Sequence, residues 1–359
     1  MFCDFMQVYQ DHGQSGNWAT VCDQLTYRVD SADGAVLHKG ATPLKIEGSY
    51  ATAFLVRCHG GVVSFSGNIG RFGRSDNVVN FSVDDTKKLI NIFLSAMGLP
   101  VFTGGQVTSS APVISDGQQD DSRRIESIYN GARVTRVDLT ENFATGSRVD
   151  ALEFMRLMSM TNYGRMKVGV YGNGETVTIG EGSRYLYQKI YLKADEMRQR
   201  QKKTEVSDDY IQHAYDSGLV RYEIEFKQAC DRVGIRPWDN CTDKKIKPIY
   251  KQYREKAIKT MKTIDDKGEA LPLPVLKTYC MFREGTDPRL HMSRATWYKH
   301  KKIIEDVKGI DISNPRASSE EPTRIIELEK YEPPQHHKPD FEFVAAQLLK
   351  AAESVRVAV

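Results

Sequence analysis

Residues 185–203, YLYQKIYLKADEMRQRQKK, alternate along their first half in a way that predicts a β-strand with two unlike faces. One face is expected to carry Tyr185, Tyr187, Lys189, Tyr191 and Lys193. The residues between them are mostly aliphatic and suit a core. The basic remainder, ADEMRQRQKK, predicts a helix. The stretch therefore indicates a strand that presents phenols and amines on the side away from the core.

Two other stretches share this pattern. In RYEIEFK (221–227) the residues Arg221, Glu223, Glu225 and Lys227 would share one face. In VTRVDLTEN (134–142) the ionic face would carry Arg136, Asp138 and Thr140. Strands of this kind predict an α+β fold, with an antiparallel sheet and helices packed on one face. From pattern alone, the other face is equally consistent with a wet, salt-bridged surface and with a site that performs chemistry.

The remaining segments predict a mixed chain of 359 residues. Patterning and turn signals give these expectations: strands around Gly60-Gly61 in 50–68, a helix in 86–98, an exposed loop in 109–124, a strand in 133–143, a helix in 147–160 capped by Ser147 and Asp150, a hairpin in 166–180, a strand and helix in 217–235, two helices in 275–312, and a tail helix in 341–359.

These elements suggest four parts. Residues 1–125 would form the β-rich half and 126–268 the other half of one domain. Residues 269–312 would form a small C-terminal helical unit, and 313–359 a linker with a tail helix.

Charge and cysteine usage narrow the class of protein. The formal net charge is only +3, but residues 242–263 hold eight Lys or Arg against two Asp or Glu. That segment is as consistent with a solvated face as with a phosphate-contacting surface. The six cysteines are scattered without a CxxC pair, which favours reduced thiols. With no signal-peptide pattern and no membrane-spanning apolar run, we expect a cytoplasmic protein that does not use a membrane.

The ionic faces offer a specific chemistry. Carboxylates such as Asp138 and Glu223 suit a hard cation like Mg²⁺, which polarises phosphoryl oxygens. A tyrosine beside them can attack phosphorus and form a covalent intermediate. Its phenol has an ordinary pKa near 10, and a neighbouring ammonium or metal ion favours the phenolate. The pattern does not decide which tyrosine would act.

Ordered blocks of the chain resemble a known family, the replication initiators of filamentous phages (the gene II protein family), with the related phage and plasmid rolling-circle initiators. The blocks are RVTRVDLTENF (133–143), GETVTIGEGSRYLYQKIYLKADEM (174–197), SGLVRYEIEFK (217–227), MSRATWYKHKKIIEDVKGIDI (292–312) and, more weakly, GNIGRFGRSDN (67–77). Their order and spacing carry the resemblance over about residues 50–312, and the length suits the vibrio-phage branch.

The resemblance implies roles for particular residues. Tyr191, in IYLK, matches the tyrosine that nicks the origin, and Lys193 matches the family's lysine. Asp138 and Glu223 match acidic positions that imply metal ligation, with Glu225 as a further ligand. The implied ion is Mg²⁺, with Mn²⁺ as the alternative.

The chain departs from the pattern of many rolling-circle initiators. It lacks a histidine–hydrophobic–histidine triplet, so carboxylates would dominate any metal site. The His336-His337 pair falls in the expected linker. Asp76-Asn77 stands where some relatives have histidine and asparagine.

The implied function is site-specific nicking and joining of DNA through a 5′-phosphotyrosine, which starts and ends rolling-circle replication of a filamentous phage genome. The implied partners are the double-stranded phage origin, single-stranded DNA, and a host helicase and DNA polymerase in the bacterial cytoplasm. The alternative is a non-catalytic, sequence-specific DNA-binding regulator of phage replication or transcription. A recombinase that leaves a 3′-phosphotyrosine is a weaker third possibility.

Origin recognition is expected in the C-terminal helical unit. The run from Met292 to Lys302 resembles the start of a recognition helix capped by Ser293. The side chains expected to meet phosphates or base edges are Arg294, Thr296, Lys299 and Lys302. An ordinary amphipathic surface helix would show the same pattern.

Overall fold

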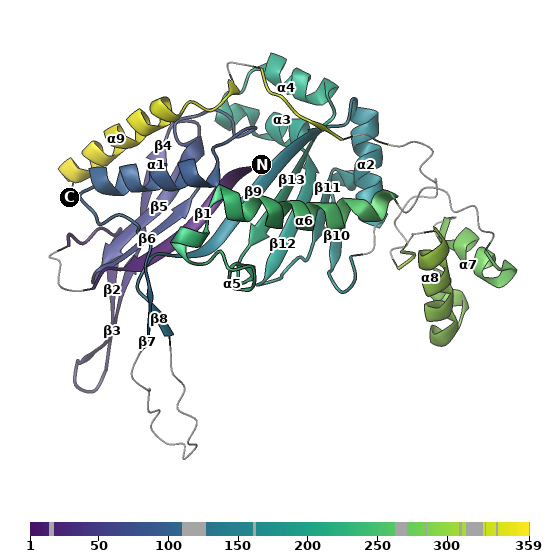
Figure 1. Ribbon diagram of the computed structural model, residues 1–359, viewed down its shortest axis with the longest axis horizontal. Helices are drawn as coiled ribbons and strands as arrows, with labels where there is room; N and C mark the ends of the chain where they lie inside the picture. Colours follow the sequence, from purple (N-terminus) through teal and green to yellow (C-terminus); the bar gives the residue numbers. More distant parts are fainter. Residues whose placement is uncertain are drawn as a thin grey trace.

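The computed structural model describes residues 1–13, 18–109, 127–160, 163–262, 271–283, 286–308, 311–313, 326, 328–334 and 337–358. Within these residues the fold is built on a large antiparallel sheet with helices against it (Figure 1). The predicted α+β class is therefore confirmed. The expected loop in 109–124 and the linker after 313 lie largely outside the described residues.

The large sheet has ten strands in the order β10-β11-β12-β13-β9-β1-β6-β5-β4, with β14 also pairing with β9. Its strands are β1 Phe2–Asp11, β4 Leu44–Gly48, β5 Thr52–His59, β6 Val62–Gly67, β9 Arg133–Ala144, β10 Val168–Tyr171, β11 Thr176–Ile179, β12 Leu186–Leu192, β13 Leu219–Phe226 and β14 Glu329–Lys330. Two hairpins stand apart, formed by β2 Gln24–Val29 with β3 Val36–Thr42 and by β7 Val107–Ser109 with β8 Ser127–Tyr129.

The centre of the sheet joins distant parts of the chain. Strand β1 lies between β6 and β9, so residues 1–125 and 126–268 contribute to one continuous sheet. This central strand had no separate signal in the sequence pattern. The pairing of β1 with β9 is interrupted by register shifts at Cys3/Phe5 and Gln7/Val8, which mark bulges.

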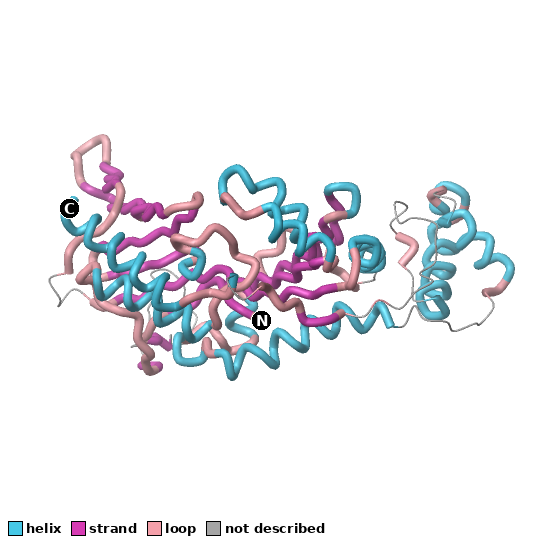
Figure 2. The backbone as a smooth tube through the Cα atoms, turned by 90° about the horizontal axis from the view of Figure 1, so that it is seen from above, coloured by secondary structure: helices cyan, strands magenta, loops and turns pink. Residues whose placement is uncertain are grey.

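Most helices cover the apolar side of the sheet, and one pair lies across the other side (Figure 2). The first group is α1 Val83–Ala96, α2 Arg148–Met160, α6 Asp243–Lys262 and α9 Phe341–Ala358. The second pair is α3 Lys193–Thr204 and α4 Asp208–Asp216. The shorter helical pieces are α5 Ala229–Arg232, η1 Ile69–Arg71, η2 Gly172–Gly174, η3 Trp238–Asn240 and η4 Pro288–His291.

The alternation seen in the sequence decides which side of each central strand is buried under helices. Leu139, Ile190 and Ile224 lie in the main hydrophobic core, together with Tyr222. The basic segment 242–263 is almost entirely helix α6, whose inner side packs on this core through buried Tyr250. Its exposed lysines include Lys244, Lys247, Lys251 and Lys256.

The C-terminal elements form two separate packings. Helices α7 Leu273–Arg283 and α8 Arg294–Lys308 share a small core of their own, centred on Phe282, Trp297 and Ile304. The expected tail helix is α9, and it is not a free tail. It packs along α1, where the rings of Phe81 and Phe341 meet edge to face at 5.8 Å.

We predict that Phe54→Ala destabilises the protein by about 3–5 kcal/mol, because it removes a buried ring and leaves a cavity. The Phe54 ring lies 5.4 Å from that of Phe65, 5.2 Å from Phe72 and 4.8 Å from Phe93, centroid to centroid. Urea unfolding measures the loss. Leu55→Ala is the matched control, because Leu55 is the next residue and is 38% exposed. Equal losses in the two variants would contradict this account of the core.

Candidate active site

The polar side of the sheet carries aligned rows of functional side chains from β9, β13 and β12. One row runs through Asn142, Arg221 and Tyr191, which are register partners on successive strands. The next runs through Thr140, Glu223 and Lys189, and the third through Asp138, Glu225 and Tyr187. The three predicted ionic strand faces therefore form one continuous surface.

Tyr191 is held by a carboxylate in the neighbouring row. Its phenol donates a hydrogen bond of 2.6 Å to Oε1 of Glu223. The ammonium of Lys189 lies 4.3 Å from the centre of the ring. Burial, followed by the charge of Glu223, raises the pKa of Tyr191 well above its ordinary value. The phenol is therefore protonated in this state, and its proton is directed at Glu223.

Glu223 is suited to receive a proton. Burial raises its pKa, and the negative charge of Asp4 adds to that effect, while the guanidinium of Arg221 opposes it. A carboxylate with a raised pKa is a better base than an ordinary one. The phenol and its acceptor are thus in hydrogen-bond contact, and the raised pKa of Glu223 increases its proton affinity.

The fully buried Arg221 lies at the centre of this surface. Its Nε donates to Oδ1 of Asn142 at 3.0 Å and its Nη2 to the carbonyl of Val78 at 2.8 Å. Its Nη1 lies 3.6 Å from Asp4 and 3.8 Å from Glu223. Burial alone would lower the pKa of Arg221, but the nearby carboxylates of Asp4 and Glu223 raise it, so the group stays charged.

Lys193 approaches the same point from a different element than expected. The sequence predicted Lys193 on the strand face beside Tyr191, but β12 ends at Leu192 and Lys193 begins α3. The side chain of Lys193 is 1% exposed. Its ammonium donates a hydrogen bond to Asn77 at 2.9 Å and forms an ion pair with Glu196 at 2.5 Å. Burial, aided by Arg221, lowers the pKa of Lys193 to about 8. The helix start, and not strand alternation, therefore places this amine.

Two site residues were not singled out from sequence. Asp4 lies at the bulge in β1 and accepts hydrogen bonds from Asn68 at 2.6 Å and from Asn77 at 3.4 Å. Both asparagines belong to the weakly matching block 67–77, so this block has a place beside Tyr191. Arg221 was assigned to the ionic face but given no role. The short N-terminal strand offered no signal that Asp4 would reach the site.

The other predicted acidic residues form a second cluster. Both oxygens of Asp138 accept from Arg136, at 2.8 and 2.6 Å. Glu225 lies 3.1 Å from Arg136 and 2.9 Å from Lys227. Burial raises the pKa of Asp138 to about 7, although Arg136 opposes the shift. The structure thus joins Glu223 to Tyr191, whereas Asp138 and Glu225 pair with cations of the protein.

The donor atoms only partly fit the predicted divalent cation. Carboxylate oxygens are suitable hard ligands, and the mutual repulsion of Glu223 and Asp4 would be relieved by a cation. Asp138 and Glu225, as arranged, are neutralised by Arg136 and Lys227. Within the described residues, no three His, Cys, Asp or Glu side chains are grouped so that they could hold a metal ion.

The position of Tyr191 is less open than the strand pattern suggested. The residue is 6% exposed because α3, α4 and the segment around Val78 pack over this end of the polar face. Glu223, by contrast, is 21% exposed. The tyrosine is thus approached from the side of Glu223 and not across an uncovered sheet.

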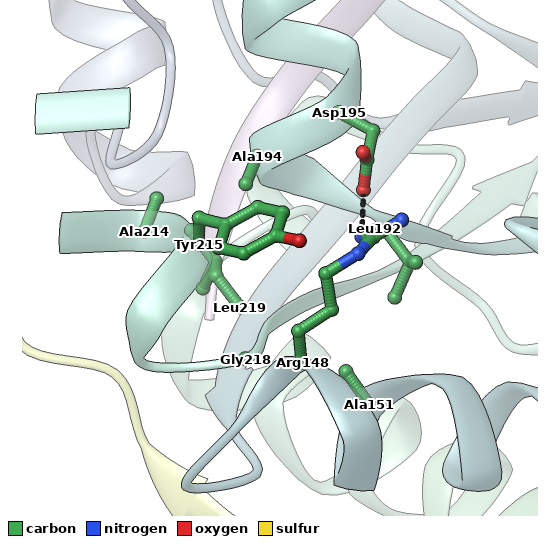
Figure 3. Close-up of a pocket in the computed structure, with 9 residues that line it drawn as sticks. All are labelled: Arg148, Ala151, Leu192, Ala194, Asp195, Ala214, Tyr215, Gly218 and Leu219. Carbon is green, nitrogen blue, oxygen red and sulfur yellow. Dashed lines mark hydrogen bonds and ion pairs between the residues drawn. The ribbon is translucent and has the colours of Figure 1, made fainter. Parts of the chain in front are cut away.

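A pocket beside the start of α3 shows how that helix is fixed (Figure 3). Arg148 extends from α2, stacks on the ring of Tyr215 and forms an ion pair with Asp195 in the first turn of α3. Arg148 also lies 3.4 Å from Glu175. These contacts secure the turn from which Lys193 projects.

Other polar side chains of these strands and of the C-terminal segment lie away from the phenol. Glu141 faces the opposite side, as strand alternation predicts, and binds Arg254 at 2.7 Å. Tyr187 lies beside Glu225 in the register, with Lys227 5.6 Å from its ring. His337 lies 3.3 Å from Asp76 and stacks on Tyr210, whereas position 336 is outside the described residues.

The predicted recognition helix is α8. Ser293 Oγ accepts from the backbone of Thr296 at 3.2 Å, so the expected cap is confirmed. Arg294, Lys299 and Lys302 are exposed on the side away from Trp297, while Thr296 is half-buried. The basic side chains of this helix thus face solvent, whereas its apolar side packs on α7.

We predict that Glu196→Gln destabilises the protein at neutral pH and that the difference from the wild type narrows as the pH falls from about 4.5 toward 2. Burial opposes ionisation of Glu196, but Lys193, Arg221 and Arg200 outweigh it and lower its pKa to about 2. A carboxyl group whose pKa is depressed in the folded state contributes stability that is fully present above its unfolded pKa. That stability is lost as the pH falls from the unfolded pKa to the folded pKa. Thermal unfolding across pH measures this. Glu353→Gln, at an exposed position of α9, is the control; a constant difference for Glu196→Gln would contradict the prediction.

Comparisons with known proteins identify the family. Residues 12–239 match the model of the N-terminal region of a phage replication-associated protein, the gene II protein. A solved rolling circle replication initiator protein from Geobacillus stearothermophilus is similar at 12% identity, with a TM-score of 0.24, over 64% of this chain and 76% of that one. No curated protein sequence matches. None of the helices among the described residues has the length and apolar content needed to cross a membrane. Because the family match spans more than half of its residues, the chain belongs to the gene II protein family of phage replication initiators.

Proposed function

We propose that this protein is a DNA nicking and joining enzyme that initiates and terminates rolling-circle replication of a filamentous phage genome. The observation that carries the proposal is the 2.6 Å hydrogen bond from the phenol of Tyr191 to Glu223, inside a cluster that also holds Lys193 and Arg221. This contact supports the proposal, because the reaction needs a nucleophile, a proton acceptor and cations close to one another.

The proposed step is a transesterification. The phenolic oxygen of Tyr191 attacks the phosphorus of one phosphodiester, and its proton passes to Glu223 along the existing hydrogen bond. The bond from phosphorus to the 3′ oxygen breaks, and that oxygen takes a proton from solvent. The 5′ phosphate remains on the tyrosine as an ester. Because bond energy is retained, attack by a 3′ hydroxyl reverses the step and joins DNA ends.

The cations have separate tasks in this proposal. Arg221 stays charged in its buried position and opposes the negative charge that develops on phosphorus and on Glu223. Lys193 lies 5.9 Å from the centre of the Tyr191 ring and can meet a phosphate oxygen that enters beside the phenol. Fixed charges of this kind are worth more in a water-poor site than in solvent.

Mg²⁺, with Mn²⁺ as the alternative, is retained in the proposal. Glu223 and Asp4 are the residues that would hold it nearest to the phenol, and Asp138 and Glu225 would have to exchange their present partners. Such an ion supplies charge neutralisation at the phosphate. The proposed partners are the double-stranded origin, the displaced single strand, and a host polymerase and helicase.

We predict that Tyr191→Phe abolishes nicking of a supercoiled origin plasmid while origin binding is retained, because the variant keeps the ring and loses only the attacking oxygen. Gel analysis of relaxed circles in the presence and absence of Mg²⁺ measures the reaction and its metal dependence. Tyr187→Phe, on the same strand face, is the matched control and should still nick.

Normal nicking by Tyr191→Phe would contradict the assignment of the nucleophile. The alternative function, a non-catalytic DNA-binding regulator, predicts specific origin binding by the wild type with no relaxed circles under any metal condition. A protein–DNA bond at a 3′ end, and not at a 5′ end, would favour the recombinase reaction.

We predict that replacing both Arg294 and Lys299 by alanine weakens origin binding and lowers the slope of log affinity against log salt by about 2, since each phosphate contact contributes about 1 to it. Binding titrations at several salt concentrations measure the slope. The double variant Lys338→Ala with Lys350→Ala removes two exposed charges elsewhere and is the control. An unchanged affinity and slope would place recognition outside α8.

A further inference from the structure

A second pocket lies next to Lys193 at the start of α3. It lies between α3 and the segment that follows η1, and its walls include Arg71, Ser75, Asn77, Lys193 and Arg200. We call it the Arg71 pocket. It shares two residues with the candidate active site, Asn77 and Lys193, which are joined by the 2.9 Å hydrogen bond from the ammonium.

The charges around the Arg71 pocket are unevenly compensated. Glu196, which also lines it, is neutralised by Lys193 at 2.5 Å and by Arg200 at 3.0 Å. Asp76 accepts from the backbone of Val78 at 3.0 Å and lies 3.3 Å from His337. The acids of the pocket therefore already have partners.

Arg71 is different. Within the described part of the chain, no carboxylate lies within ion-pair distance of its guanidinium, and its buried Nε has no hydrogen-bond partner. Burial lowers the pKa of Arg71, and the nearby acids only partly offset this. A half-buried guanidinium whose buried Nε lacks a hydrogen-bond partner is costly, and an anion bound nearby offsets that cost.

The size and position of the pocket restrict the anion. Its enclosed space is about 10 Å³, close to what a single water molecule needs, and the rest is open to solvent, so an anion would bind at its mouth. Arginine presents a planar fork of donors that matches phosphate oxygens. The hydroxyl of Ser75 and the amide of Asn77 add neutral polar groups to the same walls.

We propose that the Arg71 pocket binds a phosphodiester group of DNA, with Arg71 and Arg200 as its principal contacts. This group is the neighbour, on the same strand, of the phosphodiester that Tyr191 attacks. This inference rests on the proposed function, since it assumes that Tyr191 attacks DNA. Lys193 then lies between two successive phosphates, and the pocket fixes the register of the strand over the phenol. Arg71 and Arg200 are positioning residues in this account and take no part in the proton transfer.

The test uses the full-length protein and three variants, Arg71→Gln, Arg200→Gln and Arg198→Gln. Arg198 is the matched control, because it is an exposed arginine of the same helix whose guanidinium lies over the ring of Tyr215, 5.3 Å from its centre, outside the pocket. Binding to oligothymidylate is measured first, since it requires no nicking. We expect Arg71→Gln and Arg200→Gln each to bind about tenfold more weakly than Arg198→Gln, as for the loss of one charged hydrogen bond. Thermal unfolding checks that all three are folded.

Nicking substrates with one neutral methylphosphonate then locate the phosphate. For the wild type, we expect one position next to the scissile bond at which neutralisation raises KM about tenfold with little change in kcat. For Arg71→Gln, the same methylphosphonate should not raise KM further, because the contact with that phosphate is already absent. The inference would be overturned if the methylphosphonate raised KM for Arg71→Gln as much as for the wild type. It would also be overturned if Arg71→Gln and Arg198→Gln bound oligothymidylate equally well.

The two proposals fail separately. If the wild-type protein never nicks but Arg71→Gln still binds oligothymidylate more weakly than Arg198→Gln, the pocket is a DNA phosphate site and the catalytic proposal is wrong. If the wild type nicks and the Arg71 variant is unaffected in binding and KM, only the pocket assignment falls. Inorganic phosphate is included as a competitor. Displacement of oligothymidylate from the wild type but not from Arg71→Gln supports the site, and equal displacement from both contradicts it.

Discussion

The site depends on the interactions of one buried group, the guanidinium of Arg221. A charge without exposure to water must be paired and hydrogen-bonded, and removing its partners typically costs several kcal/mol. Arg221 largely meets this requirement: it donates to Asn142 of β9 and to the backbone at Val78, while its Nη1, which makes no hydrogen bond, lies within ion-pair distance of Asp4 in β1. The same group also holds Glu223 in an ionic environment beside Tyr191. One buried charge thereby connects the strands that carry the nucleophile and its proton acceptor.

This arrangement explains how an ordinary phenol could act at neutral pH. Burial keeps Tyr191 protonated, so activation cannot come from a preformed phenolate. In the proposed mechanism it comes instead from transfer of the proton to Glu223 as the oxygen attacks, with Arg221 and Lys193 stabilising the new negative charge. The low exposure of Tyr191 would also protect the proposed phosphotyrosine ester from water until the DNA ends are rejoined.

Much of the sheet was predictable because alternation along a strand is a strong local signal. The faces of 185–192, 221–227 and 134–142 follow from side-chain periodicity, and the contact of Tyr191 with Glu223 follows once those strands are neighbours. Three features could not be predicted. Lys193 belongs to a helix start, and strand periodicity does not show where a strand ends. Asp4 reaches the site through a bulge in a central strand far away in sequence, which no local pattern reveals. The pairing of Asp138 with Arg136 was equally hidden, because a carboxylate in a pattern looks the same whether it binds a metal ion or an arginine.

The most direct test of the central claim is to identify the residue that becomes attached to DNA. The wild-type protein is incubated with an origin oligonucleotide, the covalent adduct is isolated and digested with protease, and the peptide that carries the nucleotide is sequenced by mass spectrometry. The account predicts one modified peptide, containing Ile190-Tyr191-Leu192, with the 5′ phosphate on the oxygen of Tyr191. Attachment to any other residue, or the absence of an adduct while the DNA is nicked, would contradict it.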